Sequence, residues 1–100
     1  MEYTVYMLKD CEASAFKEFR SYGWAMSHGG VNIDEYEPVY TGRIEPRPSV
    51  SETLEAIFEM FNIDHPEDYK GRSMSTSDLV SLEGVGTFFC DSIGWKKLGI

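Results

Sequence analysis

The chain has 100 residues, a formal net charge of −8 and 42% hydrophobic residues. This length suits one domain with one core, and the composition is typical of a folded globular protein. A negative balance of this size disfavours direct binding to nucleic acid or to anionic membranes, and favours a basic partner. No apolar run approaches the roughly 20 residues that a membrane-spanning helix needs.

The cysteine content and the N-terminal segment indicate a cytoplasmic protein. Cys11 and Cys90 are too few for a disulfide framework, so we expect two reduced thiols. The N-terminal residues MEYTVYML lack the basic region of a secretory signal. Nothing in the sequence predicts a cofactor, and no motif has the ligand spacing of a metal site.

The negative charge is concentrated in residues 31–69. This segment contains ten carboxylates and two arginines, so it alone carries a net charge of −8, while the flanking segments nearly cancel. A local field of this sign attracts basic surfaces. The segment is therefore the first place to search for a partner-binding surface.

The N-terminal third predicts one strand and two short helices. Both alternating faces of residues 3–9 are largely apolar or aromatic, which favours a central strand. Short helices are predicted near 11–20 and 22–28. Ser21 is a candidate N-cap of the second, and Gly29 with the glycine after it is expected to end it.

The middle of the chain predicts a strand followed by the main helix. Residues 36–44 have a strand pattern, and Pro38, which has no amide proton, places that strand at an edge. Ser49 and Glu52 form a capping box that opens an amphipathic helix at about residues 50–61. The apolar side chains that recur at helical spacing are Val50, Leu54, Ile57, Phe58 and Phe61. The side chains on the nearly opposite face are Glu52, Glu55 and Glu59.

The last third predicts a short helix and a hairpin. Pro66 lies where the first turn of a helix near 66–70 tolerates proline, and Asp64 or the residue after it would cap that helix. Strands near 79–83 and 87–91 are joined by Gly84-Val85-Gly86, a tight-turn signal. Ile93-Gly94-Trp95 is expected to close the core. The elements together predict a single α+β domain over 1–100, with an antiparallel sheet of about four strands.

Two stretches of the second half resemble the YodL-like domain family. They are FEMFNIDHPEDYKGRSMSTSDLV at 58–80 and FFCDSIGW at 88–95. The match spans about residues 3–98, although Cys90 and Trp95 replace the residues expected there. The resemblance implies no catalytic site. It implies a genomic setting, because this family of unknown function is common in mobile genetic elements of low-GC Gram-positive bacteria.

The polar clusters have structural interpretations beside functional ones. The three acids and one histidine of 64–68 suit a helix start better than a metal site. Cys90 lies in an apolar strand, so it is expected to be a core residue rather than a thiol nucleophile activated by His28 or His65. Ser75, Ser77 and Asp78 are expected to bond nearby backbone in a turn. Asp91, at the end of the strand near 87–91, could likewise bond nearby backbone or belong to a small polar site.

The main functional hypothesis is a non-enzymatic module that binds a basic protein. The partner would be a nucleic-acid-binding protein or a nuclease, and a counter-defence inhibitor of antirestriction or anti-CRISPR type is a concrete form. The candidate partner-binding residues are Asp34, Glu35, Glu37, Glu52, Glu55 and Glu59. Mimicry of DNA requires these groups to lie on the same side.

Two alternative functions remain open. A small ligand-binding or catalytic domain would use Asp78, Asp91, His28 or Cys90, brought together in a pocket. A structural oligomerisation domain would expose its aromatics together, with Trp24, Tyr36 and Tyr40 in the contact. A monomer is favoured over an oligomer.

Overall fold

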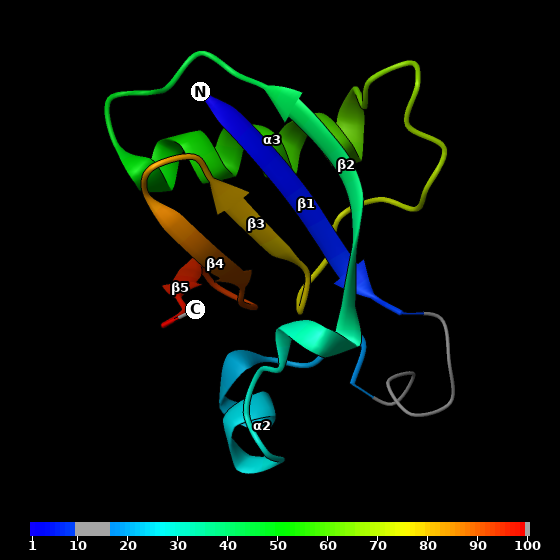
Figure 1. Cartoon of the computed structure of the whole chain (residues 1–100), viewed down its shortest axis with the longest axis vertical. Helices are drawn as coiled ribbons and strands as arrows, with labels where there is room; N and C mark the ends of the chain where they lie inside the picture. The colour runs from blue at the N-terminus through cyan, green and yellow to red at the C-terminus, as the bar shows by residue number, and fades with distance from the viewer. Residues whose placement is uncertain (10–16, 100) are drawn as a thin grey trace.

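The computed structural model describes residues 1–9 and 17–99, and five strands of this part form one antiparallel sheet (Figure 1). The strand order is β2-β1-β3-β4-β5. The strands are β1 (Glu2–Leu8), β2 (Tyr36–Arg43), β3 (Leu79–Leu82), β4 (Gly86–Cys90) and β5 (Trp95–Lys97). With the two α-helices described below, the fold is α+β, as the sequence predicts.

β1 lies inside the sheet and β2 at its edge, as predicted from the sequence. β1 pairs with β2 on one side and with β3 on the other. Tyr3, Val5 and Met7 alternate along β1 and are buried in the main core. Pro38 lies opposite Tyr6, next to a shift in the β1–β2 register. A proline is tolerated there because the edge strand needs hydrogen bonds on only one side.

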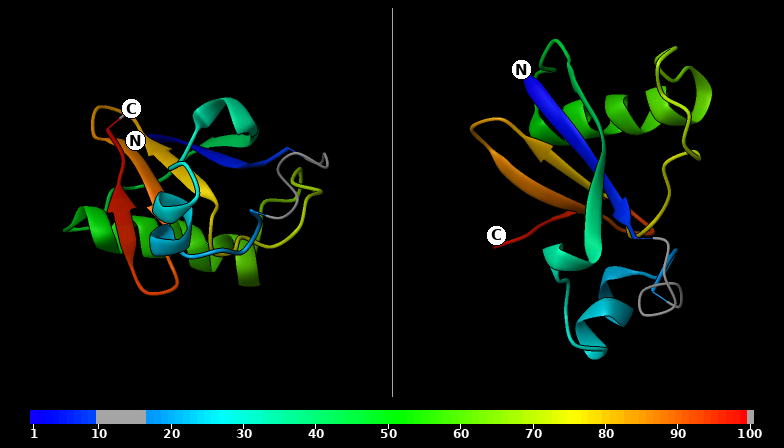
Figure 2. Two further views of the ribbon diagram at one scale, coloured as in Figure 1. Left: turned by 90° about the horizontal axis from the view of Figure 1, so that it is seen from below. Right: turned by 45° about the vertical axis from the view of Figure 1, so that its right-hand side comes forward.

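The main helix, α3 (Val50–Ile63), packs across one face of the sheet (Figure 2). The Ser49 half of the predicted capping box is present, since Ser49 Oγ accepts from Glu52 N at 3.1 Å. Glu52 Oε2 accepts from the Ser49 hydroxyl at 3.0 Å rather than from the Ser49 backbone amide. Leu54, Ile57 and Phe61 are at most 1% exposed and pack against the sheet. Burying each such side chain contributes roughly 1.5–3 kcal/mol, so this face of α3 anchors the domain.

A second cluster lies on the opposite face, where β1 ends and β2 begins. It buries Leu8, Tyr36, Leu79 and Phe89. α2 (Tyr22–Ser27) contributes Tyr22 to this cluster, and a 3-10 turn, η1 (Ile33–Glu35), leads into β2. The predicted helix near 22–28 is thus confirmed.

The ends of α2 also match the prediction. Ser21 accepts from Trp24 N as the N-cap. Gly29 and Gly30 follow with φ of 100° and 83°, which glycine adopts readily. The helix predicted near 11–20 falls largely on residues 10–16, outside the described residues, and 17–19 form a turn.

The predicted helix near 66–70 is wrong. The segment makes one turn, in which Tyr69 N donates to Pro66 O at 3.0 Å, and Asp64 is the C-cap of α3 instead of an N-cap. The physical reason is Tyr69, whose ring packs edge-on against Phe61 with the centroids 4.9 Å apart. Burying this ring requires the chain to turn into the core rather than continue as a helix.

The C-terminal segment forms a fifth strand, which the sequence prediction missed. The predicted hairpin between β3 and β4 is present. β4 then turns at Asp91–Gly94 and pairs with β5, where Trp95 lies opposite Cys90. Ile93, predicted to close the core, lies at this turn and is 89% exposed. Three residues are too short for an alternating pattern to be recognised in the sequence.

Candidate functional site

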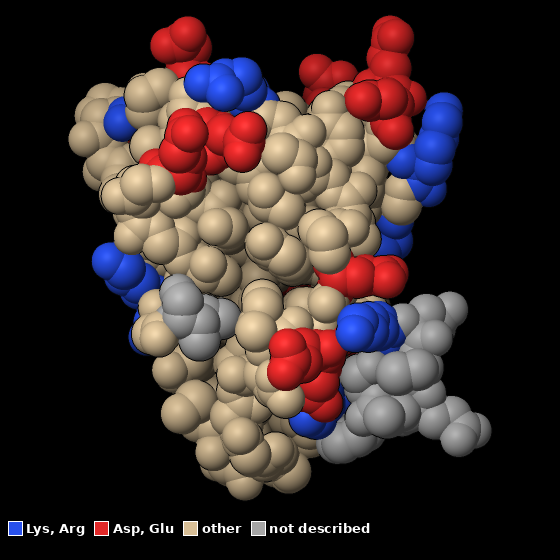
Figure 3. Space-filling model, in the orientation of Figure 1, with Lys and Arg blue, Asp and Glu red and all other residues tan. Residues whose placement is uncertain are grey.

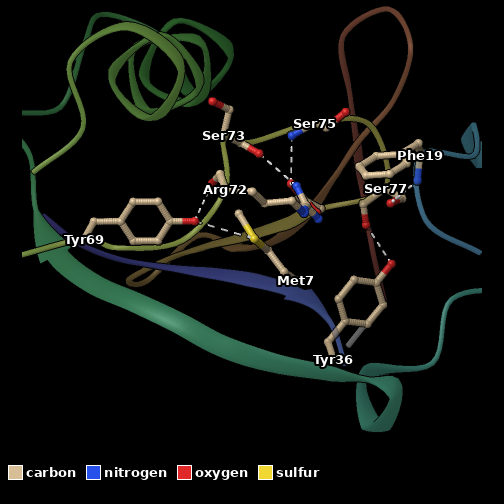
Figure 4. A network of polar contacts seen from close by, with 9 residues as sticks. Met7, Phe19, Tyr36, Tyr69, Arg72, Ser73, Ser75 and Ser77 are labelled. Carbon is tan, nitrogen blue, oxygen red and sulfur yellow. Dashed lines mark hydrogen bonds and ion pairs between the residues drawn. The ribbon is translucent and has the colours of Figure 1, made fainter. Parts of the chain in front are cut away.

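A network of polar contacts joins Tyr69, Arg72, Ser75, Ser77 and Tyr36 (Figure 4). Asp78, which is fully buried, lies at its centre. Its carboxylate accepts two hydrogen bonds from Arg72, at 2.7 Å from Nη2 and 2.9 Å from Nη1. Ser75 N donates to the same group at 2.7 Å. Burial raises the pKa of Asp78, while the guanidinium of Arg72 and the bond from Ser75 act in the opposite direction. The ion pair is therefore part of the folded core, although the side chain of Arg72 is 32% exposed.

Two tyrosines support the backbone on either side of this ion pair. Tyr69 donates its hydroxyl to Arg72 O at 2.6 Å, and Tyr36 donates to Ser77 O at 2.7 Å. Gly71 lies so close to Tyr69 that a Cβ at this position would collide with the phenol ring. The glycine is thus needed for the approach of the tyrosine hydroxyl to the chain.

Every buried polar side-chain atom of this network has a hydrogen-bond partner. Ser77 Oγ accepts from Phe19 N at 3.0 Å, although Ser77 has a φ of 85°. Among the described residues, no buried side-chain nitrogen or oxygen lacks a hydrogen-bond partner. The predicted bonding to nearby backbone is confirmed for Asp78, which accepts from Ser75 N, whereas the Ser77 hydroxyl bonds the distant amide of Phe19. The network holds the loop before β3.

The residues of the alternative catalytic set do not all meet, because Cys90 and Asp91 line one cleft that neither Asp78 nor His28 lines. Cys90 is 4% exposed, and burial, with the charges of Asp78, Glu55 and Asp91, raises the pKa of its thiol to about 12. At neutral pH it is therefore a protonated core residue, as predicted. His28 lies in a different part of the fold, stacked on Trp24 in α2 with ring centroids 3.9 Å apart.

The three aromatics named for an oligomer contact are not exposed together. Tyr36 is buried in the second cluster, whereas Tyr40 is half-buried against the main core. Trp24 is half-buried and stacked on His28. The geometry that an aromatic oligomer contact required is absent from these residues.

The structure divides the six candidate carboxylates into two groups at different ends of the molecule. Asp34, Glu35 and Glu37 lie on η1 and the start of β2, while the other three lie on α3 (Figures 1 and 2). Glu35 is paired with Lys17 at 2.7 Å. Figure 3 shows that acidic side chains also lie in separate groups on the sheet face that α3 leaves uncovered, around an uncharged centre. The acidic residues thus form no single continuous array on that face.

The three α3 carboxylates differ in their local contacts. Glu52 belongs to the capping box, and Glu59 is exposed. Glu55 Oε1 accepts a 2.9 Å hydrogen bond from Trp95 Nε1. It lines a cleft of about 160 Å³ together with Asp91 and Trp95. The sequence did not predict this grouping, since Glu55 and Trp95 are far apart in the chain.

The acidic group at 64–68 has separate local roles. Asp68 accepts from the hydroxyl of Tyr40 at 3.0 Å, and Asp64 ends α3. The described residues contain no group of three or more histidine, cysteine, aspartate or glutamate side chains suited to a metal ion. In the same residues, no helix has the length and apolar character needed to cross a membrane.

A family model described as the YodL-like domain matches residues 2–100. The chain belongs to the YodL-like domain family. No curated protein and no solved structure matches it significantly. In this YodL-like domain, the stretch at 58–80 contains Tyr69, Gly71, Arg72 and Asp78, which build the buried network. The residues that carry the family resemblance therefore stabilise the fold.

Proposed function

We propose that this YodL-like domain is a non-enzymatic module that binds a basic protein through the outer face of α3. One observation carries the proposal: Glu52, Glu55 and Glu59 form no ion pair with any described cation. Arg47, which lines a hollow with Glu59, donates instead to Glu45 O at 3.3 Å. The negative charge of this face is thus available to an external partner.

The helix does not need all three charges to fold, since only Glu52 takes part in its cap. Glu55 follows Glu52 by three residues, and Glu59 follows Glu55 by four, so neighbouring carboxylates repel each other along one face. A lysine at one of these positions would stabilise the helix better. Retaining three like charges against this cost supports a role in binding.

A counter-defence inhibitor of antirestriction or anti-CRISPR type is the concrete form that we propose. It would present carboxylates to the basic surface of a nucleic-acid-binding protein, in the mobile-element setting that the family resemblance implies. The helical rise places the three carboxylates about 4.5 and 6 Å apart along the axis, more widely than the ~3.4 Å between DNA phosphates. We therefore propose electrostatic docking on α3 rather than a close copy of a DNA strand, with Asp34 and Glu37 as a separate, secondary contact.

The test is charge reversal with a matched control. The variant E52K/E55K/E59K is compared with E2K/E45K/E67K, which makes the same change in net charge at exposed positions outside α3. Both proteins are used to capture partners from host lysate at low and high salt. We expect the α3 variant to lose a basic partner that the wild type and the control retain, and high salt to weaken binding.

The folding of the variants is measured in parallel. We expect the α3 variant to lose about 1–2 kcal/mol, because Glu52 contributes to the helix cap and Glu55 accepts the bond from Trp95. Retention of the basic partner by a folded E52K/E55K/E59K variant would contradict the proposal. Equal loss in both variants would also contradict it, because net charge rather than the α3 face would then determine binding.

A further inference from the structure

A cleft of about 160 Å³ lies between α3 and the β4–β5 turn. Glu55 and Phe58 line it from α3, and Asp91 and Trp95 line it from the turn and β5. Thr76 and Ser92 add hydroxyl groups, and Cys90 completes the lining. The cleft therefore combines aromatic surface, carboxylates and hydroxyls within a space the size of one side chain.

The aromatic wall of the cleft is held in place from two sides. The indole of Trp95 donates to Glu55 at 2.9 Å, and its ring meets Phe58 edge-on with centroids 6.3 Å apart. The indole nitrogen is thus satisfied by the same carboxylate that lines the cleft. An aromatic wall fixed beside a carboxylate favours a cation, which is attracted both to the ring face and to the charge.

The cleft has a negative field. All hydrogen bonds that the described residues make to the carboxylate of Asp91 use Oδ1. They come from Tyr22 N at 3.0 Å, Ser92 N at 2.8 Å and Ser92 Oγ at 3.5 Å. These bonds and the charge of Lys96 outweigh burial and lower the pKa of Asp91, so the group is ionised at neutral pH. The charges of Glu55 and Asp91 also raise the pKa of the Cys90 thiol, after burial. Both carboxylates thus act on the cleft interior.

We propose that this cleft receives the cationic side chain of a lysine or arginine from the basic partner. The proposal rests on the proposed function, and it names the point on the α3 face where one partner side chain is fixed. The alkyl stem would lie against Trp95 and Phe58, and the charged end would meet Glu55 and Asp91. Thr76 and Ser92 supply further acceptors for its N–H groups.

The probes for this test are single amino-acid derivatives, so no partner protein is needed. Nα-acetyl-lysine methylamide and Nα-acetyl-arginine methylamide are titrated into the full chain, and the NMR signal of the Trp95 indole N–H is followed. The matched neutral probe is the lysine derivative acetylated on Nζ. We expect a saturating shift with at least one cationic probe and none with the neutral probe.

The variants E55Q and D91N remove charge and keep a carbonyl oxygen, so Trp95, Tyr22 and Ser92 retain their acceptor. We expect each to weaken binding about fivefold, the effect of one partly exposed ion pair. E67Q, at an exposed glutamate outside α3 and outside the cleft lining, is the control, and we expect it to bind like the wild type. Preserved dispersion of the amide spectrum shows that each variant is folded.

Equal shifts with the neutral and cationic probes would overturn the proposal, as would the absence of any shift. Equal weakening of probe binding by E67Q and E55Q would also overturn it. These results are independent of the partner-capture experiment. If the cationic probes do not bind to the cleft but E52K/E55K/E59K still abolishes partner capture, the proposal of docking on α3 stands and only the cleft proposal is lost. If the probes bind to the cleft but E52K/E55K/E59K still captures the partner, the proposal of docking on α3 is overturned and the cleft proposal stands.

Discussion

The carboxylates of Asp78 and Glu59 have different roles in two regions of the molecule. Asp78 is fully buried and receives hydrogen bonds from Arg72 and Ser75. Glu59 is exposed on α3, with no ion pair among the described residues. Removing water from a carboxylate costs several kcal/mol unless a cation and hydrogen bonds replace it. The buried acid is therefore fixed by the fold, whereas the exposed one has no internal partner that fixes it.

The residues of the buried network stabilise the fold, whereas those of α3 are candidates for binding. The residues of the buried network have tertiary partners that account for their identity. On α3, Glu55 has a tertiary partner in Trp95, while Glu59 has none in the described structure. Substitutions in the two regions should therefore move different measurements, stability in the first and binding in the second.

The largest expected effect follows from breaking the buried ion pair. D78A leaves the guanidinium of Arg72 and the amide of Ser75 without their acceptor, and we expect a loss of about 3 kcal/mol. That figure is at the low end for a broken buried pair, since Arg72 keeps some contact with solvent. Urea denaturation measures the loss. A change below about 1 kcal/mol would show that the network does not stabilise the fold.

The next effect tests the close contact between Gly71 and Tyr69. G71A places a methyl group against the phenol ring, and we expect a loss of about 1–3 kcal/mol from the displaced side chain. The matched control is G23A in α2, where a Cβ meets no atom within 4 Å. Alanine also favours a helix over glycine, so G23A should be neutral or stabilising in the same denaturation assay. Equal losses in the two variants would contradict the role assigned to the Tyr69 contact.

Alkaline pH tests whether the thiol of Cys90 belongs to the core. Its pKa is raised from 9.0 to about 12 in the fold, so the folded state holds the proton more tightly than the unfolded chain. This stabilisation is complete below about pH 9 and is lost as the pH rises toward 12, by about 1 kcal/mol at pH 10.

C90A removes this contribution and serves as the comparison. We expect the variant to lose less stability than the wild type between about pH 7 and pH 10 in matched denaturation experiments. The comparison isolates Cys90 because burial also raises the pKa of Tyr3 in both proteins. An unchanged pH dependence in C90A would contradict the assignment.

The smallest expected effect concerns the exposed acids. E59Q removes the repulsion between Glu55 and Glu59, so we expect stability to be unchanged or raised by about 0.2–0.5 kcal/mol. Thermal and urea denaturation of the variant check this. A clear destabilisation would show that Glu59 has a folding role, which would weaken the contrast with Asp78.

Local signals predicted much of the fold correctly. Ser49 and Glu52 indicated where α3 begins, and the alternation in residues 3–9 indicated a central strand. The helix near 66–70 was predicted wrongly, since the local signals of Pro66 could not reveal the packing of Tyr69 on Phe61. Tertiary burial of one large ring outweighs the small preferences that start a helix.

The candidate site was less predictable than the fold. The sequence identified Glu55 and its neighbours as one face of a helix, because helical periodicity is a local property. It gave no reason to connect Glu55 with Trp95 or Asp91, which reach the cleft through the pairing of β4 with β5.

The sequence by itself determined the fold class, the main helix with its cap and acidic face, and the family. All of these depend on short-range periodicity, capping and a local motif. Only the tertiary structure decided that the candidate acids form two groups, that Arg72 pairs with Asp78, and that a cleft lies beside Trp95. The physical reason is that sheet pairing and burial join residues far apart in the chain, and no local pattern records which of them will meet.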